Sequence, residues 1–484
     1  GEDLEVGGLW LMPVFEAASY HGYDVKDYLH IADAYGGDDA FERFLAAAHQ
    51  RGLRVLLDLP LNHTADEHPW FIKAKRAPTS IEGRRYIWAD HLPSGYGFPW
   101  GGGAPFNVWH PIEGNRRYYY GAFGPQMPDL NWRRKDVKEH LFAVARYWLG
   151  KGVDGFRLDA IRYLVEDGPG RTADTPDTHR LLREFRETCK QVNPDCYLAG
   201  EAWTSQDVMM HYRGNGNEMD SCFDFDRAGA MLGAMLRGSG EDLLALLARQ
   251  GHTTPDWSYL ATFLSNHDQP RTATVLRAQP GRLRAAAALL LSLPGVPFIY
   301  YGEELGVTGD KPDPELRRPM PWTAGENGGF SSTAGWYPLP VDHDLINVDR
   351  VRREPDSLLN LYRRLIHLRQ NQPALAHGGF HPLDVNPHCI GFIRDFGGRA
   401  VLVMINLSPL PIRQPGFNLP QIDQQLQLPG VCQELLTGEP VRISREQATH
   451  GHGRGMTGRY LVERRLEGYG CIMVPYAIRS VDAR

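Results

Sequence analysis

The chain has 484 residues, of which 42% are hydrophobic and 23% are charged, and its formal net charge is −6. A chain of this length is too long for a single compact core, which predicts two or three domains, and its composition is that of an ordinary globular protein. No basic patch supports binding to nucleic acid, and the longest apolar stretch, residues 285–301, is interrupted by Pro294, Gly295 and Pro297, which excludes a membrane span.

Short apolar runs alternate with helix-like stretches along most of the chain. We expect strands at residues 9–15, 54–61, 155–160, 197–202, 222–225, 259–264 and 298–301. We expect helices at residues 38–51, 134–149, 178–191, 240–249, 282–293 and 356–370. Strands that alternate with helices predict a parallel sheet with crossover helices, an α/β fold of the (β/α)8 TIM-barrel type. Such a barrel needs eight strands and we find seven.

Two regions depart from this alternation. Residues 64–131 show no dominant crossover helix and are rich in Gly, Pro, Trp and Tyr, which predicts a small inserted domain between two barrel strands. Residues 374–484 contain expected strands at 389–396, 399–407 and 468–478 and no helical period, which predicts a C-terminal antiparallel β domain. The barrel itself is assigned to residues 1–63 and 132–373.

Cysteine usage and the start of the chain say little about cellular location. None of the six cysteines forms a C-x-x-C pair, so a zinc or thioredoxin-type motif is not expected, and disulfides are permitted without being required. The first residues lack the basic and apolar regions of a signal peptide. We therefore expect a soluble protein without a membrane partner, with the cytoplasm favoured over export, and we leave the oligomeric state open.

Ionisable residues gather where the expected barrel strands end. Asp58 lies on the second strand and is followed by Asn62 and His63, while Arg157 and Asp159 end the third with a spacing that puts both on one face. Glu201 ends the next strand, and His267 and Asp268 follow the sixth. Catalytic groups of such barrels lie at the carboxyl ends of the strands, and buried charges are costly unless they are paired or used.

Two carboxylates with different protonation states are what glycosidic cleavage requires. The guanidinium of Arg157 lowers the pKa of a neighbouring carboxyl and favours Asp159 as the charged nucleophile. Glu201 stands among Ala199, Gly200 and Ala202, and apolar surroundings raise the pKa of a carboxyl, which suits a general acid and base.

These motifs resemble those of the α-amylase family, glycoside hydrolase family 13. Residues 58–63 (DLPLNH) resemble the family's first motif, 155–159 (GFRLD) the second, 200–201 (GE) the third and 263–268 (FLSNHD) the fourth. Residues 127–131 (MPDLN) resemble a fifth motif, typical of a group intermediate between oligo-1,6-glucosidases and neopullulanases that includes bacterial α-amylases. In that family residues 9–15 would be the second strand, so we expect the first strand and helix to be missing from this chain.

The resemblance implies a role for each matching residue. Asp159 would be the nucleophile, Glu201 the acid/base, and Asp268 the acid that binds substrate hydroxyls and stabilises the transition state. Tyr23, in the segment YHGYD of residues 20–24, would stack on the glucose that is cleaved, and His63 and His267 would bind its hydroxyls. Arg157 would be a substrate-binding residue beside Asp159, and Asp58 would brace Arg157 or a neighbouring strand end.

The chemistry needs no cofactor, but the resemblance raises calcium as an open question. Many family members bind this ion beside the inserted domain through the asparagine that corresponds to Asn62. They also use a histidine at the position that Tyr163 occupies here. Asn62 is therefore the one candidate ligand.

The substrate implied is an α-glucan or maltooligosaccharide. Oligo-1,6-glucosidases carry an aspartate three residues before the stacking tyrosine, where this chain has Tyr20, which favours an open cleft and attack on internal α-1,4 bonds. Arg317, in the segment RRPMPW of residues 317–322, resembles a segment of α-glucosidases and could bind a terminal hydroxyl. An α-glucosidase and an α-glucan transglycosylase with the same residues stay as alternatives. A non-catalytic family member is disfavoured because all three acids are present.

Overall fold

The computed structural model describes residues 3–99, 107–114, 116–254, 256–418, 430–450 and 453–477. The chain divides into two compact units, each of which is described by itself. Unit 1 comprises Gly1–Glu2 and Val6–Phe223, and unit 2 comprises Asp3–Glu5 and Asp224–Arg484.

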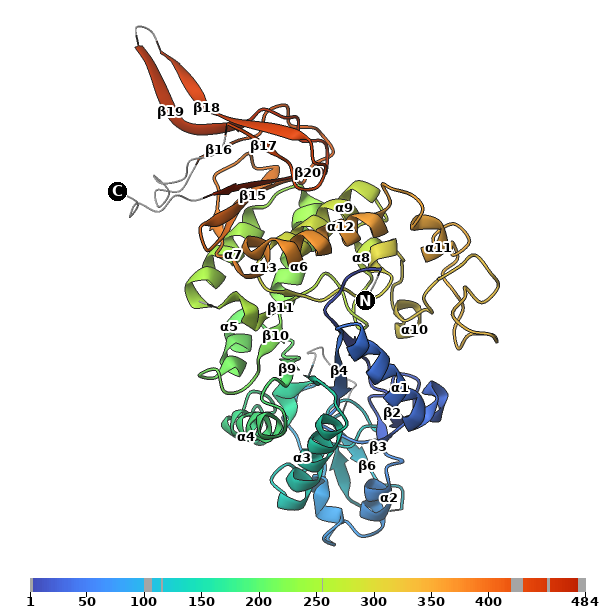
Figure 1. The fold of residues 1–484 in the computed structure, drawn as a ribbon. Coiled ribbons are helices and arrows are strands. Elements are labelled where there is room, and N and C mark those ends of the chain that lie inside the picture. Colours follow the sequence, from blue (N-terminus) through green and yellow to red (C-terminus); the bar gives the residue numbers. More distant parts are fainter. Residues whose placement is uncertain are drawn as a thin grey trace. The chain divides into compact units, whose positions relative to one another are not determined.

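Unit 1 is built on five parallel strands in the order β1-β4-β8-β9-β10. Helices α1, α3 and α4 separate successive strands in the chain (Figure 1). The bounds are β1 Gly8–Leu11, α1 Gly37–Gln50, β4 Arg54–Leu59, α3 Lys135–Gly150, β8 Gly155–Leu158, α4 Pro176–Val192, β9 Tyr197–Gly200, α5 Gln206–Met209 and β10 Ser221–Phe223. This confirms the alternation that the sequence predicted.

The first expected strand is shorter than predicted. The sequence predicts one extended strand over residues 9–15, but β1 ends at Leu11. A separate strand, β2 (Phe15–Ala17), pairs antiparallel with β3 (Val25–Ile31). Pro13 lies between β1 and β2 and has no backbone N–H to donate to a ladder. The proline therefore explains why the apolar run divides into two strands.

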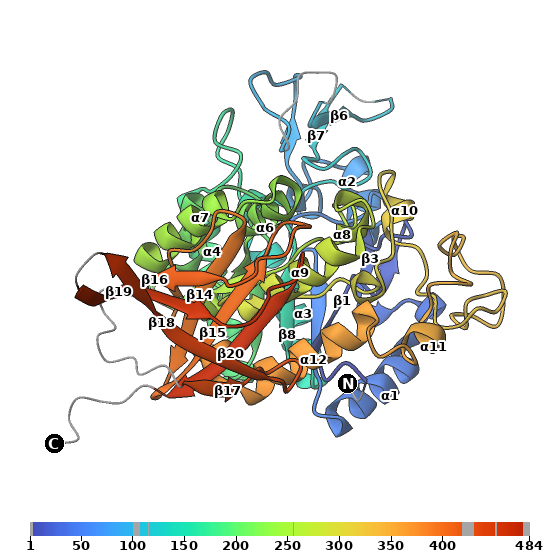
Figure 2. The same ribbon diagram turned by 90° about the horizontal axis from the view of Figure 1, so that it is seen from above.

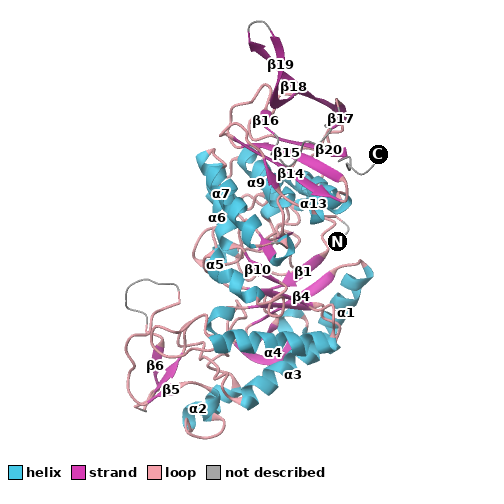
Figure 3. Cartoon of the chain, turned by 90° about the vertical axis from the view of Figure 1, so that its left-hand side faces the viewer, coloured by secondary structure: helices cyan, strands magenta, loops and turns pink. Residues whose placement is uncertain are grey.

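The inserted segment contains a helix that hydrophobic periodicity did not reveal. Helix α2 (Pro69–Arg76) begins with a proline in its first turn, and the ring of His68 accepts a hydrogen bond from Trp70 N. It is followed by a small antiparallel sheet in the order β5-β7-β6, formed by β5 Trp88–Ala89, β6 Trp109–Pro111 and β7 Tyr118–Tyr120. Figure 3 shows β5 and β6 set apart from α3 and α4. Part of the Gly-rich run that prompted the prediction, residues 100–103, lies outside the described residues.

The first part of unit 2 contains two short parallel strands, β11 (Leu260–Thr262) and β12 (Val296–Pro297), between helices. Strand β12 lies two residues before the predicted strand at 298–301. Helix α6 follows the predicted strand at 222–225 and is absent from the sequence-based prediction. The helices are α6 Phe225–Arg237, α7 Glu241–Thr253, α8 Thr272–Val275, α9 Pro280–Ser292, α10 Asp313–Leu316, α11 Val348–Val351, α12 Leu358–Asn371 and α13 Pro373–His377. Within the described residues, none of the helices combines the length and apolar character needed to cross a bilayer.

The C-terminal part of unit 2 has two antiparallel sheets with the orders β13-β14-β15-β20 and β16-β19-β18-β17 (Figure 2). Their inner faces share one apolar core that includes Leu402, Phe417, Val462 and Val474. The strands are β13 His381–Pro382, β14 Cys389–Phe396, β15 Arg399–Asn406, β16 Gly416–Asn418, β17 Val431–Gln433, β18 Pro440–His450, β19 Gly453–Val462 and β20 Cys471–Ala477. The predicted β14 is confirmed, and the predicted end of β20 at Ile478 lies outside the described residues.

Three buried arginines, two on helices and one on β14, donate to carbonyls at the end of α9. Arg227 on α6 donates to the carbonyl of residue 294, Arg369 on α12 to those of residues 291, 293 and 295, and Arg394 on β14 to that of residue 292. Five successive carbonyls, which the helix leaves without an internal partner, are therefore all paired. This network fixes α6, α12 and β14 around one helix end.

Unit 2 also buries two adjacent carboxyl groups, Glu303 and Glu304, which are 5% and 4% exposed. Glu303 accepts hydrogen bonds from Thr272 Oγ1 (2.7 Å) and Tyr362 OH (2.9 Å), whereas Glu304 Oε2 has no hydrogen-bond partner among the described residues. Burial raises the pKa of each carboxyl to about 7, against the opposing effects of these bonds and of Arg271.

We predict that Glu304 makes the protein less stable as pH rises. The pKa of Glu304 is about 7 in the folded protein and about 4.5 in the unfolded chain. Its contribution to the free energy of unfolding is therefore complete below pH 4.5 and is lost as pH rises through 7, a change on the order of 3 kcal/mol. Denaturant midpoints measured from pH 5 to pH 8 should fall less for Glu304→Gln than for the wild type. Glu326→Gln, on an exposed loop, is the control and should follow the wild type. Parallel curves for wild type and Glu304→Gln would contradict the prediction.

Candidate active site

The register of β4, β8 and β9 brings the predicted site residues of unit 1 together. Asp58 on β4 is opposite Arg157 on β8, and Arg157 is opposite Ala199 on β9. Asp159 and Glu201 directly follow the ends of β8 and β9. The carboxyl ends of parallel strands share one edge, so the four ionisable side chains meet there. Gly200 lets Ile161 and Met219 pack against the end of β9, because a Cβ at that position would lie 2.7 Å from Ile161 Cδ1 and 2.9 Å from Met219 Cγ.

The centre of this cluster is the guanidinium of Arg157, which is 1% exposed. Its Nη1 donates to Asp58 Oδ1 (2.9 Å) and Asp159 Oδ1 (2.6 Å), and its Nη2 lies 2.9 Å from Glu201 Oε2. Burial opposes the charged guanidinium, but the carboxyls of Asp58, Glu201 and Asp159 outweigh it and hold the pKa of Arg157 well above its ordinary value. One buried cation therefore holds three carboxyl groups at the strand ends.

The surroundings of Glu201 differ from the expectation. Sequence neighbours predicted an apolar setting, but Glu201 Oε2 contacts Arg157 and also accepts a hydrogen bond from Ala160 N at 3.1 Å. The prediction of an apolar setting is wrong because Arg157 pairs with Ala199 on β9. Glu201 comes two residues after Ala199, so its side chain lies on the same face of the sheet as Arg157. Asp159 and Glu201 are each 8% exposed.

Tyr23 and Trp10 complete the polar contacts around Asp58. Tyr23 OH donates to Asp58 Oδ2 at 3.0 Å, and Trp10 Nε1 donates to the same oxygen at 3.1 Å. The guanidinium carbon of Arg157 also lies 5.1 Å from the centre of the Trp10 ring. Sequence reasoning missed Trp10, although its pairing with Leu56 puts it on the face that carries Asp58, two residues further on. A period-two reading of β1 and β4 would have found it.

His63 is buried as a neutral base. Burial and the nearby His21 lower its pKa to about 3. The ring is 1% exposed, and its Nε2 has no hydrogen-bond partner in the part of the chain that the structure describes. A buried imidazole nitrogen without a partner is costly, so this atom is suited to a hydroxyl group brought by a ligand.

Asn62, the predicted calcium ligand, has a buried Oδ1 without a hydrogen-bond partner among the described residues. Its Nδ2 donates to Asp129 Oδ2 at 2.9 Å, and Asp129 Oδ1 accepts from Ala122 N. Calcium needs six to eight oxygen ligands, and the described contacts of the Asn62 side chain include one carboxylate, that of Asp129, which accepts from its amide nitrogen. The described residues contain no cluster of three or more acidic, histidine or cysteine side chains fit for a metal. Burial raises the pKa of Asp129 to about 8.

Unit 2 contains the remaining predicted residues in one cluster. Asp268 Oδ1 accepts a hydrogen bond from Arg317 Nη2 at 2.8 Å, and Asp268 Oδ2 lies 3.1 Å from His267 Nε2. Arg317 Nε also donates to the backbone carbonyl of His267 at 3.0 Å. Arg317, predicted from a motif 50 residues away, thus fixes both the side chain and the backbone of the segment that carries Asp268.

The chemistry of these groups suits attack by one carboxylate and proton transfer by another. In unit 1, Asp159 and Glu201 are both within contact of one guanidinium, which stabilises negative charge as it moves between them. In unit 2, a third carboxylate is held by an arginine and a histidine while its side chain stays 30% exposed.

Comparisons with known proteins agree with this chemistry. Residues 2–378 match the family model described as alpha amylase, catalytic domain. The chain is 32% identical over 417 residues to alpha-amylase 3 of Dictyoglomus thermophilum, a match covering 84% of this chain and 78% of that protein. It is 31% identical over 464 residues to the trehalose synthase/amylase of Mycobacterium tuberculosis, covering 84% and 76%.

A solved structure extends the likeness to the fold of nearly the whole chain. The crystal structure of the alpha-amylase from H. orenii matches with a TM-score of 0.80 and 30% identity, over 98% of this chain and 90% of that one. This confirms the predicted class, a (β/α)8 TIM barrel with a C-terminal antiparallel β domain.

We predict that Asp58→Asn destabilises unit 1 by about 3 kcal/mol. The substitution removes one of the carboxylates that neutralise the buried guanidinium of Arg157, and it turns an amide N–H toward other donors. Asp90→Asn is the matched control, since Asp90 pairs with Arg117 at 2.8 Å but its side chain is 69% exposed. Denaturant unfolding should shift by less than about 1 kcal/mol for that variant. Equal shifts for both variants would contradict the importance given to the buried pair.

Proposed function

This chain belongs to the α-amylase family of glycoside hydrolases, family 13, and we propose that it hydrolyses α-1,4-glucosidic bonds in starch-like oligo- and polysaccharides with retention of configuration. The observation that carries the proposal is the contact of Asp159 and Glu201 with one buried guanidinium, that of Arg157. A double displacement uses two carboxyl groups on one reacting centre, and a shared cation keeps both there.

In the first step, Asp159 attacks the anomeric carbon while the bond from that carbon to the leaving oxygen breaks. Glu201 gives its proton to the leaving oxygen, which takes the electron pair of the broken bond. In the second step, Glu201 removes a proton from water, the water oxygen bonds to the anomeric carbon, and Asp159 departs as a carboxylate. Two inversions restore the original configuration. No cofactor takes part in either step.

The other residues have binding roles in this proposal. The unpartnered Nε2 of His63 accepts or donates a bond to a glucose hydroxyl, and Asp268 binds substrate hydroxyls and stabilises the transition state. His267 and Arg317 hold the Asp268 carboxylate, and Tyr23 offers its ring to the face of the sugar. Neither step assigns a role to calcium.

We propose attack on internal bonds rather than removal of terminal glucose. Tyr20, where exo-acting relatives carry an acid, is 46% exposed and supplies no charged bond to a terminal hydroxyl. Arg317, the residue that argued for a closed pocket, uses its Nη2 on Asp268 and its Nε on the carbonyl of His267. This supports a role for Arg317 in holding Asp268 more than in gripping a chain end.

A transglycosylase with the same residues is the second candidate. The relative named trehalose synthase/amylase is 31% identical to this chain, nearly as much as the relative named alpha-amylase. In such an enzyme a sugar hydroxyl replaces water in the second step. Product analysis at high maltooligosaccharide concentration separates the two, since only transfer gives products longer than the substrate.

We predict that Asp159→Asn and Glu201→Gln each reduce kcat on maltooligosaccharides by at least about a hundredfold, because each removes a group that takes part in bond making or proton transfer. Circular dichroism should show that both variants are folded. Asp195→Asn, an exposed residue just before β9, is the control and should keep wild-type activity. Retention of more than about a tenth of kcat by either active-site variant would exclude its proposed role.

We predict that maltoheptaose labelled at its reducing end is first cut into a spread of maltose, maltotriose and longer pieces. An open cleft lets sugars extend on both sides of the cut, whereas a closed pocket admits only one terminal glucose. Chromatography of early time points distinguishes these patterns. Release of glucose alone, always from the unlabelled end, would identify an α-glucosidase and make the interpretation of Tyr20 wrong.

A further inference from the structure

Three successive residues join the segments that follow β8 and β9. Ala160 N donates to Glu201 Oε2 (3.1 Å), Ile161 N donates to the backbone carbonyl of Glu201 (3.2 Å), and Arg162 Nη1 donates to the backbone carbonyl of Trp203 (2.8 Å). The first two bonds come from the backbone. The third depends on a side chain, so its geometry is only as well defined as the position of Arg162.

Asp174 fixes that position. Arg162 Nε donates to Asp174 Oδ1 (2.9 Å) and Nη2 to Oδ2 (2.6 Å), a two-pronged ion pair, and Asp174 N donates back to the carbonyl of Arg162 (2.9 Å). The hydroxyl of the buried Tyr212 donates to Asp174 Oδ1. Burial opposes the charged carboxylate, but the bonds from Arg162 and Tyr212 prevail and lower the pKa of Asp174. Two-pronged arginine pairs restrict orientation more than single contacts do.

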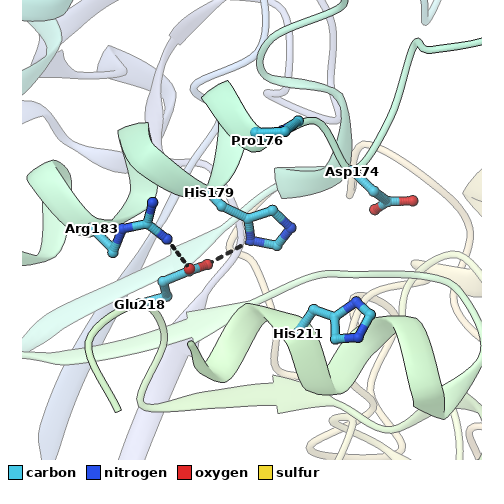
Figure 4. A pocket seen from close by; sticks show the side chains of 6 residues that line it. All are labelled: Asp174, Pro176, His179, Arg183, His211 and Glu218. Atoms are coloured by element: carbon cyan, nitrogen blue, oxygen red, sulfur yellow. Dashed lines mark hydrogen bonds and ion pairs between the residues drawn. The ribbon is translucent and has the colours of Figure 1, made fainter. Parts of the chain in front are cut away.

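Asp174 also borders a pocket of about 400 Å³ that is open to solvent. Figure 4 shows Asp174, His179 and His211 around this space, while Glu218 is bound to His179 Nδ1 (2.8 Å) and Arg183 Nη1 (2.7 Å). Small solutes can therefore reach the position of the Asp174 carboxylate from outside. Asp174 has a φ of 58°, a left-handed conformation that asparagine and glycine adopt readily and most other residues do not.

We propose that Asp174 is a positioning residue for proton transfer. Through Arg162 it holds the carbonyl of Trp203, two residues beyond Glu201, and so keeps the Glu201 carboxyl where it delivers its proton to the leaving oxygen. This inference rests on the proposed role of Glu201 as acid and base. A purely structural ion pair would affect all substrates alike, whereas a positioning role affects most those whose leaving group needs a proton.

The test compares two substrates in Asp174→Asn, which keeps the shape and the backbone conformation of Asp174 but removes its charge. The leaving group of maltotetraose is a sugar hydroxyl that requires protonation, whereas α-maltotriosyl fluoride releases fluoride with little help. We expect kcat/KM, which reports the first step, to fall about 30-fold on maltotetraose and by less than about 3-fold on the fluoride. Arg162→Lys keeps the positive charge but loses the two parallel N–H donors that bind Asp174, and it should show the same difference between substrates.

Asp136→Asn is the matched control, because Asp136 also pairs with an arginine (Arg85, 2.9 Å) and its side chain is 30% exposed, close to the 27% of Asp174. This variant should lose equally little activity on both substrates. Equal losses on the two substrates in Asp174→Asn and in Arg162→Lys would overturn the inference. A wild-type protein that cleaves neither substrate would instead overturn the proposed function.

Rescue by an external carboxylate provides an independent readout. In Asp174→Gly, sodium formate or acetate can enter through the pocket and pair with Arg162 in place of the lost side chain. We expect either salt to raise kcat on maltotetraose by about tenfold, and sodium chloride at equal ionic strength to have no effect. No gain from either carboxylate would contradict the requirement for a negative charge beside Arg162.

Discussion

A guanidinium buried almost completely from water organises the cluster of carboxyl groups at the strand ends of unit 1. Arg157 is 1% exposed, and such a charge is tolerated in a protein interior only when opposite charges surround it. Asp58, Asp159 and Glu201 supply those charges, and each of them is buried in turn. Neither the cation nor the carboxyls would be stable in this place alone. The stability of unit 1 and its chemistry therefore depend on the same four side chains.

Parallel pairing makes this arrangement possible. Three strands present residues to one edge in a fixed register, so Asp58, Arg157 and the residues after β8 and β9 become neighbours without any loop having to bring them together. Side chains on rigid strands lose little further entropy when they bind a substrate. Bonds from Ala160, Ile161 and Arg162 extend this order into the segment that carries Glu201.

Unit 2 uses arginine in a related way. Arg317 fixes Asp268 and the carbonyl of His267, and Arg227, Arg369 and Arg394 pair with the carbonyls at the end of α9. The planar guanidinium, with five donors, can satisfy several buried acceptors at once. Because Arg394 lies on β14 and Arg369 on α12, the helices and the C-terminal sheets of this unit share one polar core as well as their apolar contacts.

The sequence by itself determined the alternation of strands and helices, the C-terminal strands β14 and β15, and the positions of Asp159 and Glu201 directly after two strands. These features depend on local periodicity and on motifs with fixed spacing. The sequence-based prediction lacked α2 and the division of the first strand at Pro13. It also lacked α6, although Phe225, Ala228 and Met231 of this helix follow a helical period. Only the tertiary structure decided the partners. The contact of Glu201 with Arg157, of Arg317 with Asp268 and of Arg162 with Asp174 depends on register and on the paths of loops. Those are set by packing between segments that are distant in the chain, which no local pattern encodes.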